Sequence, residues 1–331
     1  MCCGTPGPFG ANPHVLGAAG VNRQATIAAP APHAFLSRAI RETLSNYAYL
    51  LPAALCLGGT VLFPILKAIH MSLYHNVLSR PQDYRFIGLG NYLRMIHDPT
   101  FWLTLKNSFV WVFSSVSIQF VLGFLGALLL NAEFRGRTFC RTLNLLPWII
   151  PGVVVGLVWE YLYQPNYGPL NDILRRVGLL RVPIAWLSDP AFAMASVIFT
   201  NIWRGIPFFT IMILAGLQAI PDEVYEAATV DGASVTQRFW HITLPMLRPI
   251  IVVATATRII WTFNYADLIF VMTSGGPANA TQITSSYTLL TAYTDLDFGY
   301  AATLSVILLL IMLVFTACYL KLTKGVESVS G

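Results

Sequence analysis

The chain has 331 residues, of which 56% are hydrophobic and 11% charged, whereas soluble domains contain roughly 45–50% apolar and about 25% charged residues. Together with a mean hydropathy of +0.63, this composition excludes an ordinary soluble enzyme and indicates that lipid surrounds most of the chain. The net charge of +5 does not indicate nucleic-acid binding, because the basic residues are scattered singly between apolar runs and are not gathered on a polar face.

The first 45 residues are rich in Gly, Pro and Ala, most clearly over residues 3–13. They lack the order of basic, apolar and small residues that marks a cleaved signal peptide. Such a composition buries too little apolar surface to offset the cost of ordering the chain. Residues 1–45 are therefore predicted to form a mostly disordered tail.

Cysteine usage gives no sign of a disulfide framework or a metal site. The cysteines are odd in number, lack metal-ligand spacing, and fall in the tail or in apolar stretches; they are Cys2, Cys3, Cys56, Cys140 and Cys318. A disulfide framework would be expected to show an even number at regular spacing. We expect no metal in this chain.

Six apolar stretches are long enough to cross a membrane, which takes ~20 residues because every backbone polar group must be paired within the helix. They cover about residues 48–72, 107–130, 142–163, 191–217, 250–272 and 299–320. The third stretch holds Gly152 and Gly156, a small-residue spacing typical of close helix approach. The predicted fold is an all-α membrane protein with about six transmembrane helices over residues 46–325, followed by a short tail over 326–331.

The distribution of Lys and Arg predicts the orientation, because cytoplasmic loops carry an excess of both. The tail, the loop between the second and third spans and the C-terminal end hold Arg23, Arg38, Arg41, Arg135, Arg137, Arg141, Lys321 and Lys324. Basic residues also occur on the opposite side, over 80–106 and 175–181. The two sides therefore differ in how densely Lys and Arg occur, and neither side is free of them. Both termini are predicted to be cytoplasmic, and so is the segment 218–249 between the fourth and fifth spans.

The segment 218–249 is polar and patterned. Pro221, followed by two acidic residues, resembles a helix start, since acids favour the positive end of the helix dipole. Gly232 permits a turn into a second short helix, which is predicted to end near Pro245. Two short helices at a turn would make a rigid projection suited to a partner's groove, although an amphipathic loop on the membrane surface is the alternative.

The spacing within this segment resembles a known motif. Glu226-Ala-Ala, three residues, Gly232, nine residues and then Ile242-x-Leu-Pro is similar to the EAA motif of permease subunits of binding-protein-dependent ABC importers. The resemblance extends over nearly the whole chain after residue 45, to the carbohydrate-uptake, maltose-type branch. It is carried by FIGLGNY at 86–92, VWEYLY with NYGPLN at 158–171, AWLSDP at 185–190 and TSGGPANAT at 273–281.

This resemblance implies a type I ABC importer permease fold in the bacterial inner membrane. In the family, the motif forms a coupling helix that docks on a cytoplasmic ATPase, so the expected coupling residues are Glu226, Ala227, Ala228, Asp231, Gly232, Leu244 and Pro245. An extracytoplasmic solute-binding protein delivers the sugar. The implied partners also include a second permease subunit, with a heterodimer favoured, and two ATPase subunits.

The chain is not expected to be an enzyme in its own right. No GxxxxGK[ST] pattern occurs in the sequence, and that loop is what cradles nucleotide phosphates in many ATPases. The resemblance therefore implies that ATP and Mg are bound by the separate ATPase subunits, and no cofactor is expected in this chain.

Ionisable residues inside spans predict where substrate would bind, because each costs ~2.5–3.5 kcal/mol on insertion scales and should face a cavity or a partner. Helical spacing places two polar and aromatic faces on the fourth and fifth spans. In maltose-type permeases the aligned positions line the sugar site, which implies as substrate-binding residues Asn201, Arg204, Gly205, Phe208, Arg258, Trp261, Thr262 and Tyr265.

The two arginines depart from what a neutral sugar requires. One interpretation is an internal ion pair of Arg204 or Arg258 with Glu160 or Asp267. If an arginine has no such partner, an anionic ligand is favoured, because the guanidinium fork matches a carboxylate or phosphate. Uronate oligosaccharides, such as alginate or pectin fragments, then rank above the alternatives of neutral oligosaccharides and glycerophospho-compounds.

Two other classes of membrane protein are alternatives to an importer permease. A secondary transporter would also have a midplane site, but it would not need the cytoplasmic projection and would transport without ATP hydrolysis. An intramembrane serine protease would need a nucleophile and a base that face each other, and the sequence has no GxSx motif with a spanning His.

Overall fold

The computed structural model describes residues 49–327, of which the side chains are described as far as Thr323. The described residues fall into two units, one over 49–60 and the other over 61–327. In the first unit the described residues are helical, and the Thr60 hydroxyl donates to the Cys56 carbonyl at 2.7 Å. The predicted tail over residues 1–45 and the terminal residues 328–331 lie outside the described part of the chain.

Five helices in residues 49–327 are long and apolar enough to cross a membrane: Tyr49–Ser72, α4 (Pro99–Asn131), α8 (Pro190–Gln218), Val235–Asn264 and Phe298–Thr323. The first ends in the π-helical turn η1 (Gly58–Leu62) and α2 (Phe63–Ser72), and the last belongs to α14 (Phe298–Glu327). A sixth span results if the bent pair of α5 (Arg137–Ile149) and α6 (Gly152–Leu162) is counted as one.

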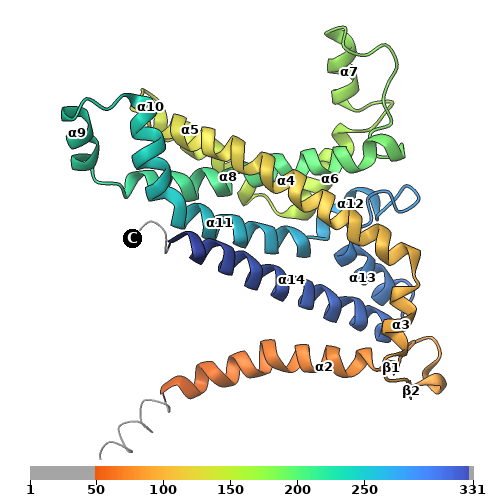
Figure 1. Ribbon diagram of the computed structural model, residues 1–331. Helices are drawn as coiled ribbons and strands as arrows, with labels where there is room; N and C mark the ends of the chain where they lie inside the picture. Colours follow the sequence, from red (N-terminus) through yellow and green to blue (C-terminus); the bar gives the residue numbers. More distant parts are fainter. Residues whose placement is uncertain (1–48, 328–331) are drawn as a thin grey trace, which may run out of the picture. The chain divides into compact units, whose positions relative to one another are not determined.

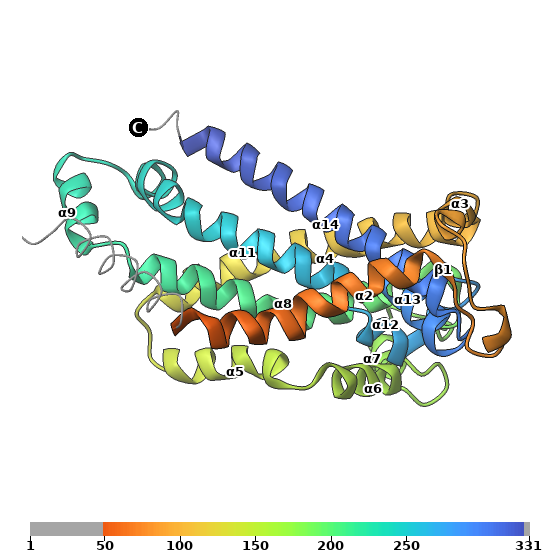
Figure 2. The ribbon, with the colours of Figure 1, turned by 90° about the horizontal axis from the view of Figure 1, so that it is seen from below.

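Within the second unit, α4 and α8 pack along much of their length, and α11 (Leu244–Asn264) packs against both (Figures 1 and 2). Both long helices begin at an Asp-Pro pair. Asp98 accepts from the Thr100 amide at 2.8 Å and Asp189 from the Ala191 amide at 2.9 Å. Each side chain therefore satisfies one free N–H at a helix start, and the proline that follows lacks the N–H that would otherwise be unpaired there.

The stretch predicted as the third span consists of two helices that meet at 93°. Pro151 is the N-cap of α6, and the preceding Ile150 has extended backbone angles, with φ −68° and ψ 130°. A residue before proline is pushed out of the α region by the proline ring. The bend at residues 150–151 follows from that restriction.

The helix predicted to end near Pro245 instead continues through it. The α10 helix (Val235–Arg238) leads into the π-helical turn η3 (Phe239–Thr243) and then directly into α11. Pro245 lacks the N–H that would donate one turn back in this continuous helix, and the π-helical turn η3 directly before it marks the local change in the hydrogen-bond pattern. At the other end, α11 stops at Asn264, and a break at Tyr265 and Ala266 separates it from α12 (Asp267–Thr273).

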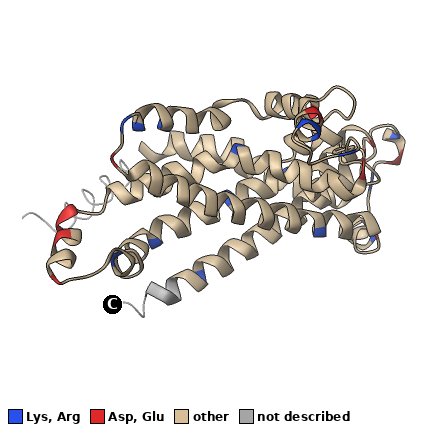
Figure 3. Ribbon diagram, turned by 90° about the horizontal axis from the view of Figure 1, so that it is seen from above, with Lys and Arg blue, Asp and Glu red and all other residues tan. Residues whose placement is uncertain are grey.

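Short elements lie at the two ends of the second unit (Figure 1). One end carries the antiparallel pair β1 (Tyr74–His75) and β2 (Arg85–Phe86), the turn η2 (Pro81–Asp83), α3 (Gly90–Ile96), α7 (Pro169–Arg176) and α13 (Thr284–Tyr293). The other end carries α9 (Asp222–Val230) and α10. Acidic residues concentrate in α9 and at the opposite end, and the helices between them carry little charge (Figure 3).

Candidate functional site

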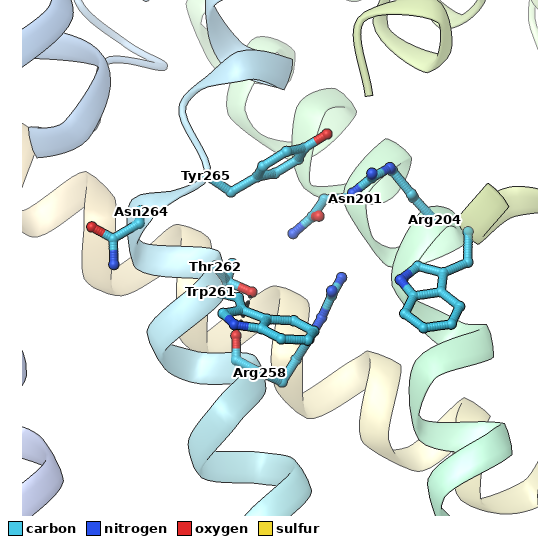
Figure 4. A pocket seen from close by; sticks show the side chains of 8 residues that line it. Asn201, Arg204, Arg258, Trp261, Thr262, Asn264 and Tyr265 are labelled. Atoms are coloured by element: carbon cyan, nitrogen blue, oxygen red, sulfur yellow. Dashed lines mark hydrogen bonds between the residues drawn. The ribbon is translucent and has the colours of Figure 1, made fainter. Parts of the chain in front are cut away.

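A cavity of about 360 Å³ lies where α8 and the end of α11 face each other. Figure 4 shows side chains from both helices turned toward this space. Its lining consists of Trp148, Asn201, Arg204, Arg258, Trp261, Thr262, Asn264 and Tyr265. The helical spacing in the sequence thus predicted six residues that the fold brings together around one cavity.

Arg258 is 5% exposed and is held by a glutamine on α4. Its Nε donates to Gln119 Oε1 at 2.8 Å, and Gln119 Nε2 donates to the Asn201 carbonyl at 2.7 Å. Gln119 therefore links α4, α8 and α11 behind the cavity. Gln119 was not predicted as a site residue, although a carboxamide in the middle of an apolar span is a sequence signal for such a position.

Arg204 faces Arg258 from α8. Its guanidinium carbon lies 4.9 Å from the centre of the Tyr265 ring, a cation–π distance. Among the side chains described over residues 49–323, neither arginine forms an ion pair with Glu160, Asp267 or another carboxylate. The cavity therefore holds two cations that are balanced by hydrogen bonds and aromatic rings but by no described anion.

Several buried polar atoms at the cavity have no hydrogen-bond partner among the described residues. They are both carboxamide atoms of Asn201, the Arg204 Nε and the Tyr265 hydroxyl. Buried polar groups are nearly always paired in folded proteins, and leaving one unpaired costs about 1–3 kcal/mol. The Tyr265 hydroxyl lies against Gly152 of α6, whereas the unpaired atoms of Asn201 and Arg204 beside a cavity are typical of a polar ligand site.

Two of the predicted substrate residues support the cavity and do not line it. A Cβ atom at Gly205 would collide with the Arg258 guanidinium and the Gln119 amide, so a glycine here lets that pair lie against α8. Phe208 is 6% exposed, and its ring centre lies 5.4 Å from that of Trp261. Trp148 and Asn264, which line the cavity, were not identified from the sequence.

The predicted coupling segment is an exposed helix and turn at the α9 end of the unit (Figure 1). In α9, Glu226 and Ala227 are exposed, and Ala228 is half-buried. The following Asp231 and Gly232 are also exposed, and Gly232 has φ +78°, a value that residues with a side chain rarely adopt. Segment 222–234 therefore presents its motif residues outward.

Side-chain contacts hold α9 against the start of the next helix. The Tyr225 and Thr243 hydroxyls lie 2.9 Å apart, and Arg238 donates to the Thr229 hydroxyl at 2.8 Å. Ser234 and Gln237 form a reciprocal capping box at the start of α10. Of the remaining motif residues, Leu244 packs against the main hydrophobic core and Pro245 is exposed on the continuing helix.

A family model for the inner-membrane component of binding-protein-dependent transport systems matches residues 119–328. This range contains α8, α9, α11 and α14, and thus both the cavity and the coupling segment. It begins at Gln119 and leaves out α2 and most of α4.

Curated relatives match over most of the chain. The trehalose/maltose transport system permease protein of Thermococcus litoralis is 37% identical, over 86% of this chain and 95% of its own length. The sulfoquinovosyl glycerol transport system permease protein of Agrobacterium fabrum is 36% identical, over 83% of this chain and 89% of its own length.

Among solved structures, a chain of a bacterial ABC transporter involved in the import of the acidic polysaccharide alginate has the same fold. It superposes with a TM-score of 0.75, covers 87% of this chain and 98% of its own length, and is 23% identical. At that identity the likeness concerns the fold alone.

Proposed function

The chain belongs to the family of inner-membrane components of binding-protein-dependent transport systems, and on that premise we propose that it forms half of the pathway of an ATP-driven sugar importer. The two relatives above support a carbohydrate substrate, since their names give trehalose or maltose and sulfoquinovosyl glycerol. A second permease subunit forms the other half, and a solute-binding protein supplies substrate from outside. Two ATPase subunits hydrolyse ATP on the cytoplasmic side.

This function requires a defined orientation. The excess of Lys and Arg in the tail, at residues 135–141 and at the C-terminal end supports cytoplasmic termini. The α9 end then faces the cytoplasm, and the end with α3, α7 and β1 faces outward. A tag placed after residue 324 that reports the outside would contradict this topology.

We propose that α9 and the turn at Gly232 are the docking element for the ATPase. Its exposed motif residues and its internal contacts make it a rigid projection. Since no atom would lie within 4 Å of a Cβ at Gly232, Gly232→Val should act through backbone strain of about 1–3 kcal/mol and not through crowding. We expect normal insertion with substrate-stimulated ATPase activity reduced at least several-fold; unchanged stimulation would exclude this role.

The substrate we propose is a sugar or oligosaccharide with an acidic group, such as a uronate. The observation that carries this proposal is the pair of arginines, Arg204 and Arg258, that face one cavity without a carboxylate partner in the described chain. A charge-assisted contact to an anion contributes ~1.5–3 kcal/mol. That amounts to roughly ten- to hundredfold in affinity at the site.

The test compares a uronate oligosaccharide with its reduced, neutral counterpart in the reconstituted transporter. Arg204→Leu and Arg258→Ser should slow transport of the acidic sugar roughly tenfold or more beyond any loss for the neutral one. Arg258→Lys, which keeps the charge, should retain most of the preference. The matched control is Arg80→Ser, which removes an exposed arginine outside the cavity.

Each variant and the wild type are measured with the same solute-binding protein. The selectivity of that protein then cancels when the ratio of acidic-sugar to neutral-sugar transport is compared between variant and wild type. Equal losses for the acidic and neutral sugars would show that the arginines support structure only. The proposal of an acidic substrate would then be withdrawn.

A further inference from the structure

A second cavity, of about 530 Å³, lies on the other side of the break between α11 and α12. It is partly open and is lined by residues of α11, α12, α13 and α14, and its apolar wall includes Leu308 and Met312. Asn264 lines both cavities. In Figure 4 the Asn264 side chain points away from Asn201 and Arg204, so it lies at the boundary between the two spaces.

The polar part of this cavity contains hydroxyls, one amide and one carboxylate. Its polar residues are Asn264, Asp267, Ser285, Thr288 and Ser305. No Lys, Arg or His is among the lining residues. Since sugars bind through hydroxyl groups that both donate and accept hydrogen bonds, a lining with both kinds of partner suits an uncharged sugar unit.

These groups have hydrogen-bonding capacity that the described chain does not use. Ser285 is 8% exposed, and its hydroxyl has no partner among the described residues. Asp267 is exposed and forms no ion pair with the side chains described over residues 49–323. Thr288 and Ser305 donate to the carbonyls of Thr284 and Ala301, at 2.9 and 3.0 Å, which leaves their oxygens able to accept.

The two cavities carry opposite charge on the two sides of one helix end. The first holds Arg204 and Arg258 and no carboxylate, and the second holds Asp267 and no cation. We propose that the second cavity is a subsite for an uncharged, hydroxyl-bearing unit of the same substrate whose acidic group lies at the two arginines. This inference rests on the proposed function.

The opposite charges of the two cavities restrict which substrates would fit both. A neutral neighbouring unit can donate hydroxyl hydrogens to Asp267 in charge-assisted hydrogen bonds. A second acidic group at that position would meet a like charge. The preferred ligand therefore has an acidic group on one unit and a neutral unit next to it, and a chain with an acid on every unit is disfavoured.

The test uses the complete reconstituted transporter and two probes of equal length. One is a disaccharide with one uronic acid and one neutral sugar, and the other is the corresponding di-uronate. Wild type should transport the mono-acid faster. Asp267→Asn should slow the mono-acid several-fold and speed the di-acid, shifting their ratio roughly tenfold toward the di-acid, with Asp267→Ser as a second variant should the first fold poorly.

Two further variants serve as controls. Ser285→Ala should slow both probes alike, because it removes a hydrogen bond and no charge. Asp295→Asn removes an exposed carboxylate outside the cavity and should leave the ratio unchanged.

An unchanged ratio in both Asp267 variants would overturn the second subsite. The arginine variants separate this failure from failure of the proposed function. If they distinguish acidic from neutral sugars while the Asp267 variants do not shift the ratio, only the subsite is wrong. If the arginine variants do not distinguish acidic from neutral sugars and the Asp267 variants do not shift the ratio, the proposal of an acidic substrate is itself wrong.

Discussion

Two clusters of charged and aromatic residues in the second unit differ in how completely they are paired. At the cavity, Arg204 and Arg258 have no carboxylate partner in the described chain, and buried atoms of Asn201 and Tyr265 have no hydrogen-bond partner there. Near α3 and the start of α14, by contrast, Arg94, Asp98 and Asp297 all have partners within the described chain.

In that second cluster, which we call the outer cluster, Arg94 pairs with Asp297 at 2.7 Å and stacks 4.1 Å from the centre of the Tyr300 ring. Partial burial acts to lower the pKa of Arg94, but the hydrogen bond and charge of Asp297 outweigh it and raise the pKa. Asp98 accepts from the Tyr287 hydroxyl at 2.8 Å and from the Tyr300 hydroxyl at 2.6 Å.

The difference indicates different roles. A cluster whose partners all come from the chain joins α3, α4, α13 and α14 and contributes to stability. Each buried polar group without a partner lowers the stability of the fold by about 1–3 kcal/mol. A ligand that forms the missing hydrogen bond recovers this free energy. Substitutions in the outer cluster should therefore change stability, and those at the cavity should change transport.

The largest effect on stability is expected at Gly299, next to the outer cluster. A Cβ atom there would collide with the backbone carbonyl of Tyr74, and backbone atoms cannot move aside as a side-chain end can. Gly299→Ala should lower the free energy of unfolding by about 1–3 kcal/mol, measured by thermal unfolding in detergent. Transport per folded molecule should remain near wild type; selective loss of transport would contradict the assigned role.

Gly205 is the matched glycine at the cavity. A Cβ there would displace the Arg258 guanidinium and the Gln119 amide, which are movable side-chain ends. Gly205→Ala should therefore reduce transport of the acidic sugar about tenfold, equivalent to ~1.4 kcal/mol, with a smaller change in melting temperature than Gly299→Ala. If Gly205→Ala lowered the melting temperature more than Gly299→Ala, the assignment of stability to the outer cluster and of transport to the cavity would be wrong.

The smallest effect is expected at Asp98. Partial burial acts to raise the pKa of its carboxyl, but hydrogen bonds from Tyr300, Tyr287 and Thr100 outweigh it and hold the pKa below the ordinary 3.8. A lowered pKa in the folded state stabilises the protein above the ordinary pKa, and this contribution is lost as the pH falls through the folded value.

Asp98→Asn should thus cost about 1 kcal/mol at neutral pH, since the side chain is partly exposed. The difference from wild type should shrink below about pH 4, where wild-type Asp98 also becomes protonated. Melting temperatures of both proteins between pH 3 and 7 would measure this. A constant difference over that range would show that the carboxylate charge has no part in the effect.

The sequence by itself determined the class of fold, the approximate positions of most spans and the two faces that meet at the cavity. These follow from local physics. Lipid requires long apolar helices, and a period of 3.6 residues places positions i, i+3, i+4 and i+7 on one face. The left-handed turn at Gly232 was likewise foreseen, because only glycine adopts it freely.

The tertiary structure alone decided which polar groups are paired. Gln119 contacts Arg258 from 139 positions away in the chain, and no local pattern contains that pairing. The 93° bend at residues 150–151 and the break at Tyr265 bring Trp148 and Asn264 to the cavity. Whether a charged residue within a span meets a carboxylate, an amide or a cavity depends on how helices distant in sequence pack, and that packing determined that Arg204 and Arg258 face the cavity and not Glu160 or Asp267.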